Sequence, residues 1–223
     1  MTLSDIHYIN VAASLRSSKA LGPGNRAVLW SMGCNQRCQG CISPEWQSNE
    51  PANCVSIEAL AHDLLVENPA VRGITISGGE PMLQAKANAA MLNYARQYRS
   101  FDVLVYSGYT LDHLLSSSMP GVREFLDEID VLIDGPYRQD LAVTGQLFGS
   151  SNQRVHFLSD RIRPQEIMQW ENHLELHITN GEVMMVGIPD KKQLAAFDSA
   201  IDHVQKHTNF HLEVENEMDQ EAV

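Results

Sequence analysis

The sequence predicts an α/β protein whose core is a partial (β/α) barrel or a curved parallel sheet, followed by a small C-terminal α+β appendage. Apolar runs alternate with helical patterns between residues 27 and 134, which is typical of parallel βα units. The chain has 223 residues, 43% of them hydrophobic, so it can bury a large core. After about Arg163 the pattern changes. This change predicts a core domain at 1–163, an appendage at 164–210 and an acidic tail at 211–223.

The first predicted strand is the apolar run at 27–30, which leads directly into a loop with three cysteines. A helix is expected at 56–67, because apolar residues recur at helical spacing and Ser56 stands in the capping position. The later core elements are predicted in alternation: strand 73–77, helix 82–98, strand 102–107, a helical segment at 111–126 and strand 130–134. In such sheets ligands bind beyond the carboxyl ends of the strands. A site is therefore expected among the loops at those ends.

The appendage is predicted from a turn signal and a helix cap. Asn180 and Gly181 lie between two strand-like runs, and this pair favours the type I′ turn of a tight hairpin. Asp190 and Gln193 resemble a capping box before a helix whose apolar residues share one face. Residues 211–223 carry five acids and are predicted to form a solvated tail.

Composition limits the classes of partner. Lys and Arg number 16 against 28 Asp and Glu, a net charge of -12, which argues against electrostatic binding of nucleic acid or anionic lipid. No apolar run approaches the roughly eighteen residues of a membrane span. The N-terminus lacks the basic flank, apolar stretch and cleavage site of a secretory signal. We therefore expect a cytoplasmic protein that binds neither nucleic acid nor membrane.

Cys34, Cys38 and Cys41 stand together in one loop, GCNQRCQGC. In a reducing compartment such a group is more typical of metal binding or redox chemistry than of structural disulfides. Three thiolates in a loop can hold a [4Fe–4S] cube, which normally takes four, and so leave one iron without a protein ligand. The alternatives are a zinc knuckle, which needs a fourth ligand such as Cys54 or a histidine, and simple buried cysteines.

The cysteine spacing, the preceding AVLWSMG and the GGEP segment after the next strand together resemble the radical SAM enzymes. The resemblance implies the radical SAM type of sheet and S-adenosylmethionine chelated to the open iron. One electron from the reduced cluster would cleave this cofactor to methionine and a 5′-deoxyadenosyl radical, which abstracts hydrogen from a substrate. Cys34, Cys38 and Cys41 would be the cluster ligands and the catalytic residues. GGEP alone is a weaker signal, because a Gly-Gly turn before a Pro-led helix is a common structural device.

Within this superfamily the chain is similar to the activating proteins of anaerobic ribonucleoside-triphosphate reductases. It shares a glycine before the third cysteine, Gly40, where an aromatic residue is frequent, and a GPG-x-R segment at 22–26. It also shares a strand ending in DGP and a later GSSNQR, so that the resemblance covers about residues 8–158. The implied partners are a glycyl radical enzyme, first of all an anaerobic ribonucleotide reductase, and a low-potential electron donor such as flavodoxin or ferredoxin.

The resemblance also implies roles for nine loop residues. They are, in chain order, Gly40, Cys41, Ile42, Gly78, Gly79, Glu80, Ser107, Asp134 and Ser151. The first three would line the adenine side of the cofactor, and the next three would hold its methionyl end. Ser107 and Asp134 would meet the ribose or a nearby cation, for which an ordinary turn and a loop-capping carboxylate are the structural alternatives. Ser151, Asn152 and Arg154 would order a loop over the cofactor, or merely form a polar turn.

Two other functions stay open. One is a radical SAM maturase or modifying enzyme that acts on another protein, a peptide or a small molecule; further cysteines in the appendage would favour it, and the appendage contains none. The other is a non-catalytic iron–sulfur or zinc-binding module, which would not cleave S-adenosylmethionine. Cys54 fits none of the family's ligand positions and is expected to take no part.

Overall fold

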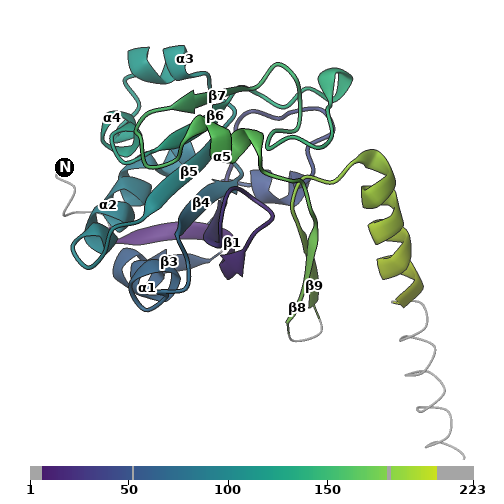
Figure 1. Cartoon of the computed structure of the whole chain (residues 1–223), viewed down its shortest axis with the longest axis horizontal. Helices are drawn as coiled ribbons and strands as arrows, with labels where there is room; N and C mark the ends of the chain where they lie inside the picture. The colour runs from purple at the N-terminus through teal and green to yellow at the C-terminus, as the bar shows by residue number, and fades with distance from the viewer. Residues whose placement is uncertain (1–6, 52, 180–181, 205–223) are drawn as a thin grey trace, which may run out of the picture. The chain divides into compact units, whose positions relative to one another are not determined.

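The computed structural model describes residues 7–51, 53–179 and 182–204. The chain forms two compact units. One comprises Met1–Glu175 and Val186–Ile188, and the other comprises Leu176–Met185 and Pro189–Val223. The first unit contains a seven-stranded sheet in the order β3-β1-β2-β4-β5-β6-β7 (Figure 1).

The middle of this sheet consists of four parallel strands. They are β2 (Arg26–Ser31), β4 (Gly73–Gly78), β5 (Asp102–Ser107) and β6 (Val131–Asp134). Every residue of β2 and of β6 is buried, which is typical of parallel strands covered on both faces. The four strands predicted from apolar runs are therefore confirmed, with bounds that differ only at their ends.

The outer strands are antiparallel, a feature that the sequence pattern does not predict. β1 (Tyr8–Ser18) pairs with β2 and with β3 (Cys54–Ser56), and β7 (Arg154–Phe157) pairs with β6. Small residues in the middle of β1 weaken its alternation, and β7 has only 4 residues. The expected parallel sheet is thus a parallel centre with antiparallel edges.

The helices follow the predicted order but are shorter. α1 (Ile57–Ala61) continues into a π-helical turn at His62–Val66, and the Ser56 hydroxyl accepts a bond from Ala59 N–H at 3.1 Å, which confirms the predicted cap. A 3₁₀ turn at Pro81–Gln84 precedes α2 (Ala85–Arg96).

The helical segment predicted at 111–126 is not one continuous helix. It consists of two helices, α3 (Leu111–Ser116) and α4 (Val122–Leu126). Pro120 disfavours continuation from α3. Gly121 has a φ of 82°, which caps the start of α4 in a conformation that other residues rarely adopt. The last helix of the first unit is α5 (Pro164–Met168).

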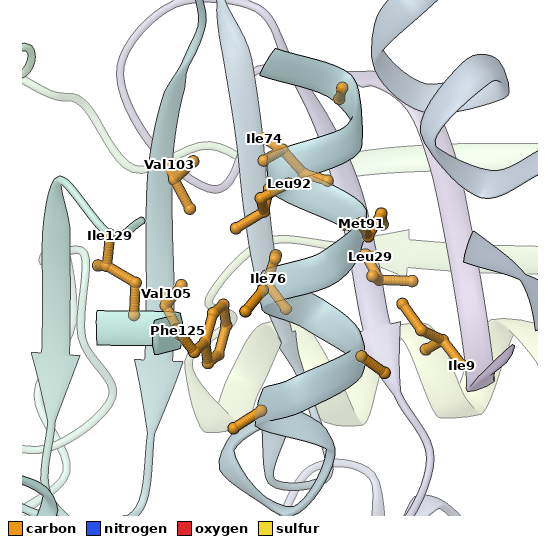
Figure 2. Packing of buried hydrophobic residues seen from close by; sticks show 14 of the residues in the cluster. Ile9, Leu29, Ile74, Ile76, Met91, Leu92, Val103, Val105, Phe125 and Ile129 are labelled. Carbon is orange, nitrogen blue, oxygen red and sulfur yellow. The ribbon is translucent and has the colours of Figure 1, made fainter. Parts of the chain in front are cut away.

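The largest core lies between the sheet and helices α1, α2 and α4 (Figure 2). Met91 and Leu92 of α2 are fully buried and pack in this core. Val103 and Val105 of β5 face the same core, whereas Leu104 between them belongs to a smaller core on the other face, which α5 helps to cover. This alternation shows that the parallel strands are covered on both sides.

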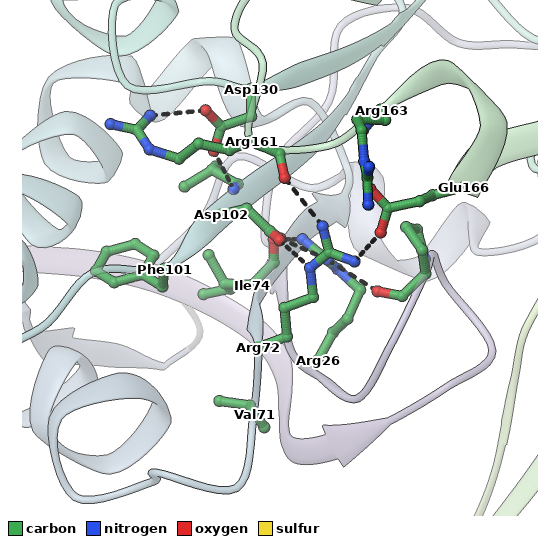
Figure 3. Close-up of polar contacts among 12 residues, drawn as sticks. Arg26, Val71, Arg72, Ile74, Phe101, Asp102, Asp130, Arg161, Arg163 and Glu166 are labelled. Atoms are coloured by element: carbon green, nitrogen blue, oxygen red, sulfur yellow. Dashed lines mark hydrogen bonds and ion pairs between the residues drawn. The ribbon is translucent and has the colours of Figure 1, made fainter.

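A buried ion network lies where the parallel strands begin (Figure 3). Arg26, from the GPG-x-R segment, is fully buried, and its Nη1 lies 2.6 Å from Asp102 Oδ1. Arg26 Nε also donates to Thr75 Oγ1 at 2.8 Å. Arg72 pairs with Asp102 as well and with Glu166 of α5. The GPG-x-R arginine is therefore part of the fold at the edge opposite the carboxyl ends of the strands.

The second unit includes most of the predicted hairpin and helix. β8 (Glu175–Thr179) pairs with β9 (Glu182–Val186), and residues 191–204 are helical. Asp190 N–H donates to Gln193 Oε1 at 2.9 Å and Gln193 N–H donates to Asp190 Oδ1 at 2.8 Å, which confirms the capping box. The turn at 180–181 and the tail at 211–223 lie outside the described residues.

α5 belongs to the first compact unit, although it follows residue 163. The division of the chain at residue 163 into a core and an appendage stays a prediction. Within the described part of the chain, no helix is both long enough and apolar enough to cross a membrane.

Candidate functional site

The cysteine loop (residues 33–41) follows β2, and the loops after β4, β5 and β6 all contact it. These are the GGEP loop (78–81), the SGYT loop (107–110) and the DGP loop (134–141). Because the four strands are parallel, their carboxyl ends lie at one edge of the sheet. The predicted location of a site is therefore occupied by four adjoining loops.

The GGEP loop lies directly against the cysteine loop. Gly79 N–H donates to Ser31 O and Glu80 N–H donates to Gly33 O, both at 2.8 Å. A Cβ atom at Gly79 would collide with the carbonyl oxygen of Gly33, and one at Gly78 would lie 2.6 Å from Ser31 O. Both glycines are thus required for the close approach of two backbones, in addition to any contact with a ligand.

The SGYT and DGP loops contact the cysteine loop from other sides. Asn35 Nδ2 donates to the Tyr109 hydroxyl at 2.6 Å, and a Cβ atom at Gly108 would lie 2.6 Å from Gln36 Cγ. Gly40 has a φ of 73°, and a Cβ atom there would lie 2.8 Å from Gln139 Cδ. Because the end of the Gln139 side chain can move, the positive φ is the reason that favours glycine before the third cysteine.

The three loop cysteines are free thiols close enough to affect one another electrostatically. Burial raises the pKa of the Cys34 thiol; the Gln36 N–H, 3.4 Å from Cys34 Sγ, opposes this, and the charges of Glu80 and Cys41 add to it. Burial also raises the pKa of Cys38, and the charges of Cys34 and Cys41 raise it further. Several thiolates this close need a strongly positive partner to be ionised together. An iron–sulfur cluster supplies that charge, so the donor set fits a [4Fe–4S] group.

Within the described ranges, no three His, Cys, Asp or Glu side chains converge as ligands of a single metal ion. A zinc ion requires its four ligands around one atom, whereas a cube takes each thiolate on a different iron and so holds them further apart. Cys54, the possible fourth thiol, is exposed on the edge strand β3.

Glu80 is fully buried behind the cysteine loop. Its Oε1 accepts from Met82 N–H at 3.0 Å and from the Ser107 hydroxyl at 2.9 Å, and its Oε2 accepts from Gly108 N–H at 2.7 Å. Burial raises the pKa of Glu80 to about 7, and the three donors limit the rise. The carboxyl group therefore connects the GGEP and SGYT loops, and a role of residues 78–80 at a methionyl group stays a prediction.

Ser107 and Asp134 make protein contacts in this structure. The Ser107 hydroxyl donates to Glu80 and accepts from Tyr109 N–H at 3.1 Å. Asp134 Oδ2 accepts from Leu111 N–H at 2.6 Å and lies 2.9 Å from His156 Nε2. These contacts agree with the turn and capping alternatives, and a role for either residue at the ribose stays a prediction.

The GSSNQR segment contacts the DGP loop. Asn152 Nδ2 donates to Pro136 O at 2.8 Å and Gln153 Nε2 donates to Gly135 O at 3.0 Å. Ser151 is exposed and bonds through its backbone, since its N–H donates to Leu141 O at 2.8 Å. Loop ordering in this structure thus comes from Asn152 and Gln153, while the cofactor role of Ser151 remains a prediction.

The remaining predicted residues flank the third cysteine. Ile42 directly follows Cys41 and is 55% exposed, so its side chain can meet a ligand. Sequence reasoning did not select Asn35, Tyr109 or Gln139, although each contacts a neighbouring loop at the site. In the sequence, only their position could have pointed to these three residues, since all three stand in loops after parallel strands.

Comparison with known proteins identifies the family. Residues 20–156 match the family described as "4Fe-4S single cluster domain". The anaerobic ribonucleoside-triphosphate reductase-activating protein of Escherichia coli (strain K12) is 34% identical over 145 residues, which cover 61% of this chain and 91% of that protein. The protein of the same name from Vibrio cholerae is 32% identical over 142 residues, which cover 60% and 89%.

Another relative, which matches over a shorter stretch, belongs to another activating system. The pyruvate formate-lyase-activating enzyme of Staphylococcus epidermidis is 40% identical over 68 residues, which cover 28% of this chain and 27% of that enzyme. The family match ends at residue 156, before α5 begins. With its three loop thiols and the long match to the reductase-activating proteins, this chain belongs to the radical SAM family of activating enzymes, which carry a [4Fe–4S] cluster and use S-adenosylmethionine.

Proposed function

We propose that this enzyme generates a glycyl radical on a partner enzyme, and that the partner is an anaerobic ribonucleoside-triphosphate reductase. The observation that carries the proposal is the cysteine loop, with three neighbouring thiols, enclosed by three loops in a chain of this activating family. The names of the relatives that match along most of their length support the choice of partner.

The protein's own groups have three tasks in this proposal. Cys34, Cys38 and Cys41 would hold the cluster through three thiolates and leave one iron free for S-adenosylmethionine. When bound, these cofactors supply the 5′-deoxyadenosyl radical that takes a hydrogen atom from a backbone glycine. The backbone of 78–80 holds the methionyl end, and residues 40–42 line the adenine side.

Charge and burial at the site fit this use. Glu80 carries its carboxyl group away from solvent and fixes the SGYT loop, so the cofactor is bound by an ordered frame. Ile42 is exposed beside the third cysteine, where it can pack on an adenine ring. Ser107 and Asp134 are proposed to meet the ribose or a nearby cation, because the loops that carry them adjoin the cysteine loop. Ser151 is proposed to help order a loop over the cofactor.

Further parts of the proposal concern the setting of the reaction. The sheet is proposed to curve as the partial barrel of the radical SAM type, with the chemistry in residues 1–163. A low-potential donor such as flavodoxin or ferredoxin supplies the electron, and the protein acts in the cytoplasm. The acidic composition, with a net charge of -12, supports a function without nucleic acid or membrane.

Anaerobic reconstitution tests the chemistry. We expect wild type to bind four irons per chain in one [4Fe–4S] cluster and, with a reductant, to release 5′-deoxyadenosine from S-adenosylmethionine. Cys34→Ala, Cys38→Ala and Cys41→Ala should each lose this activity, whereas Cys54→Ala, the matched control on exposed β3, should keep it. Absence of cleavage by wild type would favour a non-catalytic module. Cleavage without a radical on the reductase would favour a maturase that acts on another substrate.

A further inference from the structure

A chain of hydrogen bonds leaves the cysteine loop just before Cys34. Gly33 O accepts from Glu80 N–H at 2.8 Å. The Glu80 carboxyl group then accepts from the Ser107 hydroxyl at 2.9 Å and from Gly108 N–H at 2.7 Å. Because Glu80 is fully buried and Ser107 is 4% exposed, water does not compete for these bonds. The position of the SGYT loop is thereby fixed relative to the residue before the first cysteine.

The same chain returns to the cysteine loop just after Cys34. Ser107 Oγ accepts from Tyr109 N–H at 3.1 Å, and the Tyr109 hydroxyl accepts from Asn35 Nδ2 at 2.6 Å. Cys34 therefore stands between two residues, Gly33 and Asn35, that are both bonded into one circuit. Tyr109 closes that circuit.

The ring of Tyr109 is itself held in place. It stacks on His113 of α3 with ring centroids 5.0 Å apart and planes 8° apart. Its carbonyl oxygen accepts from Gly135 N–H in the DGP loop at 3.3 Å. A ring fixed by stacking and by its own backbone presents its hydroxyl at a defined point. Asn35 consequently bonds to a rigid acceptor.

We propose that Tyr109 is a positioning residue for Cys34, the first cluster cysteine. By fixing Asn35, it keeps the following Gln36 N–H directed at Cys34 Sγ, to which it donates at 3.4 Å. Hydrogen bonds to the sulfurs are among the features that set the reduction potential of iron–sulfur clusters. Tyr109 thus orients Cys34 and, through the hydrogen bond to its sulfur, influences the reduction potential of the cluster that Cys34 holds. The second effect rests on the proposed function, whereas the first concerns this loop alone.

Tyr109→Phe tests the proposal because it keeps the ring and its stacking and removes only the hydroxyl. Tyr106→Phe is the matched control: Tyr106 also lies in the β5 region, but its hydroxyl donates to Leu147 O at 2.9 Å in the other core. In the apoprotein, the alkylation rate of each cysteine is followed by mass spectrometry over a range of pH, and the rates of the fully ionised thiols are compared, so that they report access to the sulfur and not its ionisation. One net hydrogen bond corresponds to about 1 kcal/mol, or about a fivefold change in rate. We expect Tyr109→Phe to speed alkylation of Cys34 about fivefold and Tyr106→Phe to leave it unchanged.

A second variant and a second readout separate positioning from general stability. Asn35→Ala should speed Cys34 alkylation as Tyr109→Phe does, and the double variant should add nothing further, because both remove one bond. In reconstituted protein, Tyr109→Phe should shift the midpoint potential of the cluster and speed iron release to a chelator. Equal acceleration at Cys34, Cys38 and Cys41 with a lower melting temperature would show mere loosening and overturn the proposal. So would a wild-type alkylation rate in Tyr109→Phe.

The apoprotein result is independent of radical chemistry. If wild type does not cleave S-adenosylmethionine but Tyr109→Phe still exposes Cys34 selectively, the proposed function fails and the positioning role stands. If cleavage occurs but Cys34 reacts at the same rate in both proteins, the positioning role fails and the proposed function stands.

Discussion

Replacing Asp102 by asparagine should destabilise the fold far more than replacing an exposed aspartate. Asp102 is 4% exposed and Arg26 is fully buried, and their charged atoms lie 2.6 Å apart. Arg72 pairs with the other oxygen of the same carboxylate. The remaining bonds of Arg26 go to neutral oxygens, those of Pro23, Ile74 and Thr75. Asp102→Asn thus leaves a buried guanidinium without the carboxylate that neutralises it.

The expected magnitude follows from burial. Breaking a buried ion pair by removing one partner costs about 3–5 kcal/mol, against a total stability of about 5–15 kcal/mol for a native domain. At about 2–4 °C per kcal/mol for a chain of this size, the melting temperature should fall by about 6–20 °C. Asp63→Asn is the control, because Asp63 pairs with Arg16 and both side chains are about half exposed. Such a surface pair contributes at most about 1 kcal/mol.

The assay is thermal and guanidinium unfolding of the apoprotein under anaerobic conditions, so that cluster loss does not contribute. The slope of the guanidinium transition should stay unchanged, which would show that the native state is the one affected. The reasoning is refuted if Asp102→Asn unfolds within about 1 kcal/mol of Asp63→Asn, since Arg26 would then not depend on its buried partner.

Two further predictions concern α5 and the GGEP loop. The hydrogen bond from Arg72 lowers the pKa of Glu166 from 4.5 to about 2, so its stabilisation is present above about pH 4.5 and is lost as the pH falls towards 2. The unfolding free energy of Glu166→Gln should therefore fall less steeply than that of wild type across this range; parallel pH profiles would contradict this. Gly79→Ala should abolish cluster binding, measured as iron per chain, because the new Cβ meets Gly33 O. Gly145→Ala, at a φ of 75° with open space around it, should retain full iron, and equal iron loss in both would refute the packing argument.

Much of the first unit could be predicted because its signals are local. The apolar runs that form β2 and β6 are buried throughout, and Ser56 caps α1 through a bond to a residue three positions away. β7 could not be predicted, because its 4 residues are only partly buried and it depends on β6 for its pairing. Local patterns therefore gave the centre of the sheet and missed its edges.

The site shows the same division between local and long-range signals. Cys34, Cys38 and Cys41 are recognisable from their spacing alone. The bond from Asn35 to Tyr109 joins residues 74 positions apart, and the register of the parallel strands decides that they meet. The Glu80 carboxyl group faces the Ser107 hydroxyl for the same reason. Long-range hydrogen bonds between loops carry no signal in one sequence.

Transfer of a labelled hydrogen atom from the partner tests the central claim most directly. The reductase would be prepared with deuterated glycine and mixed anaerobically with the reconstituted enzyme, a reductant and S-adenosylmethionine. The proposed function predicts a glycyl radical in the electron spin resonance spectrum and one deuterium in the 5′-deoxyadenosine that is released, and neither with Cys34→Ala. Unlabelled 5′-deoxyadenosine together with a silent reductase would contradict the claim that this enzyme acts on a glycine of that partner.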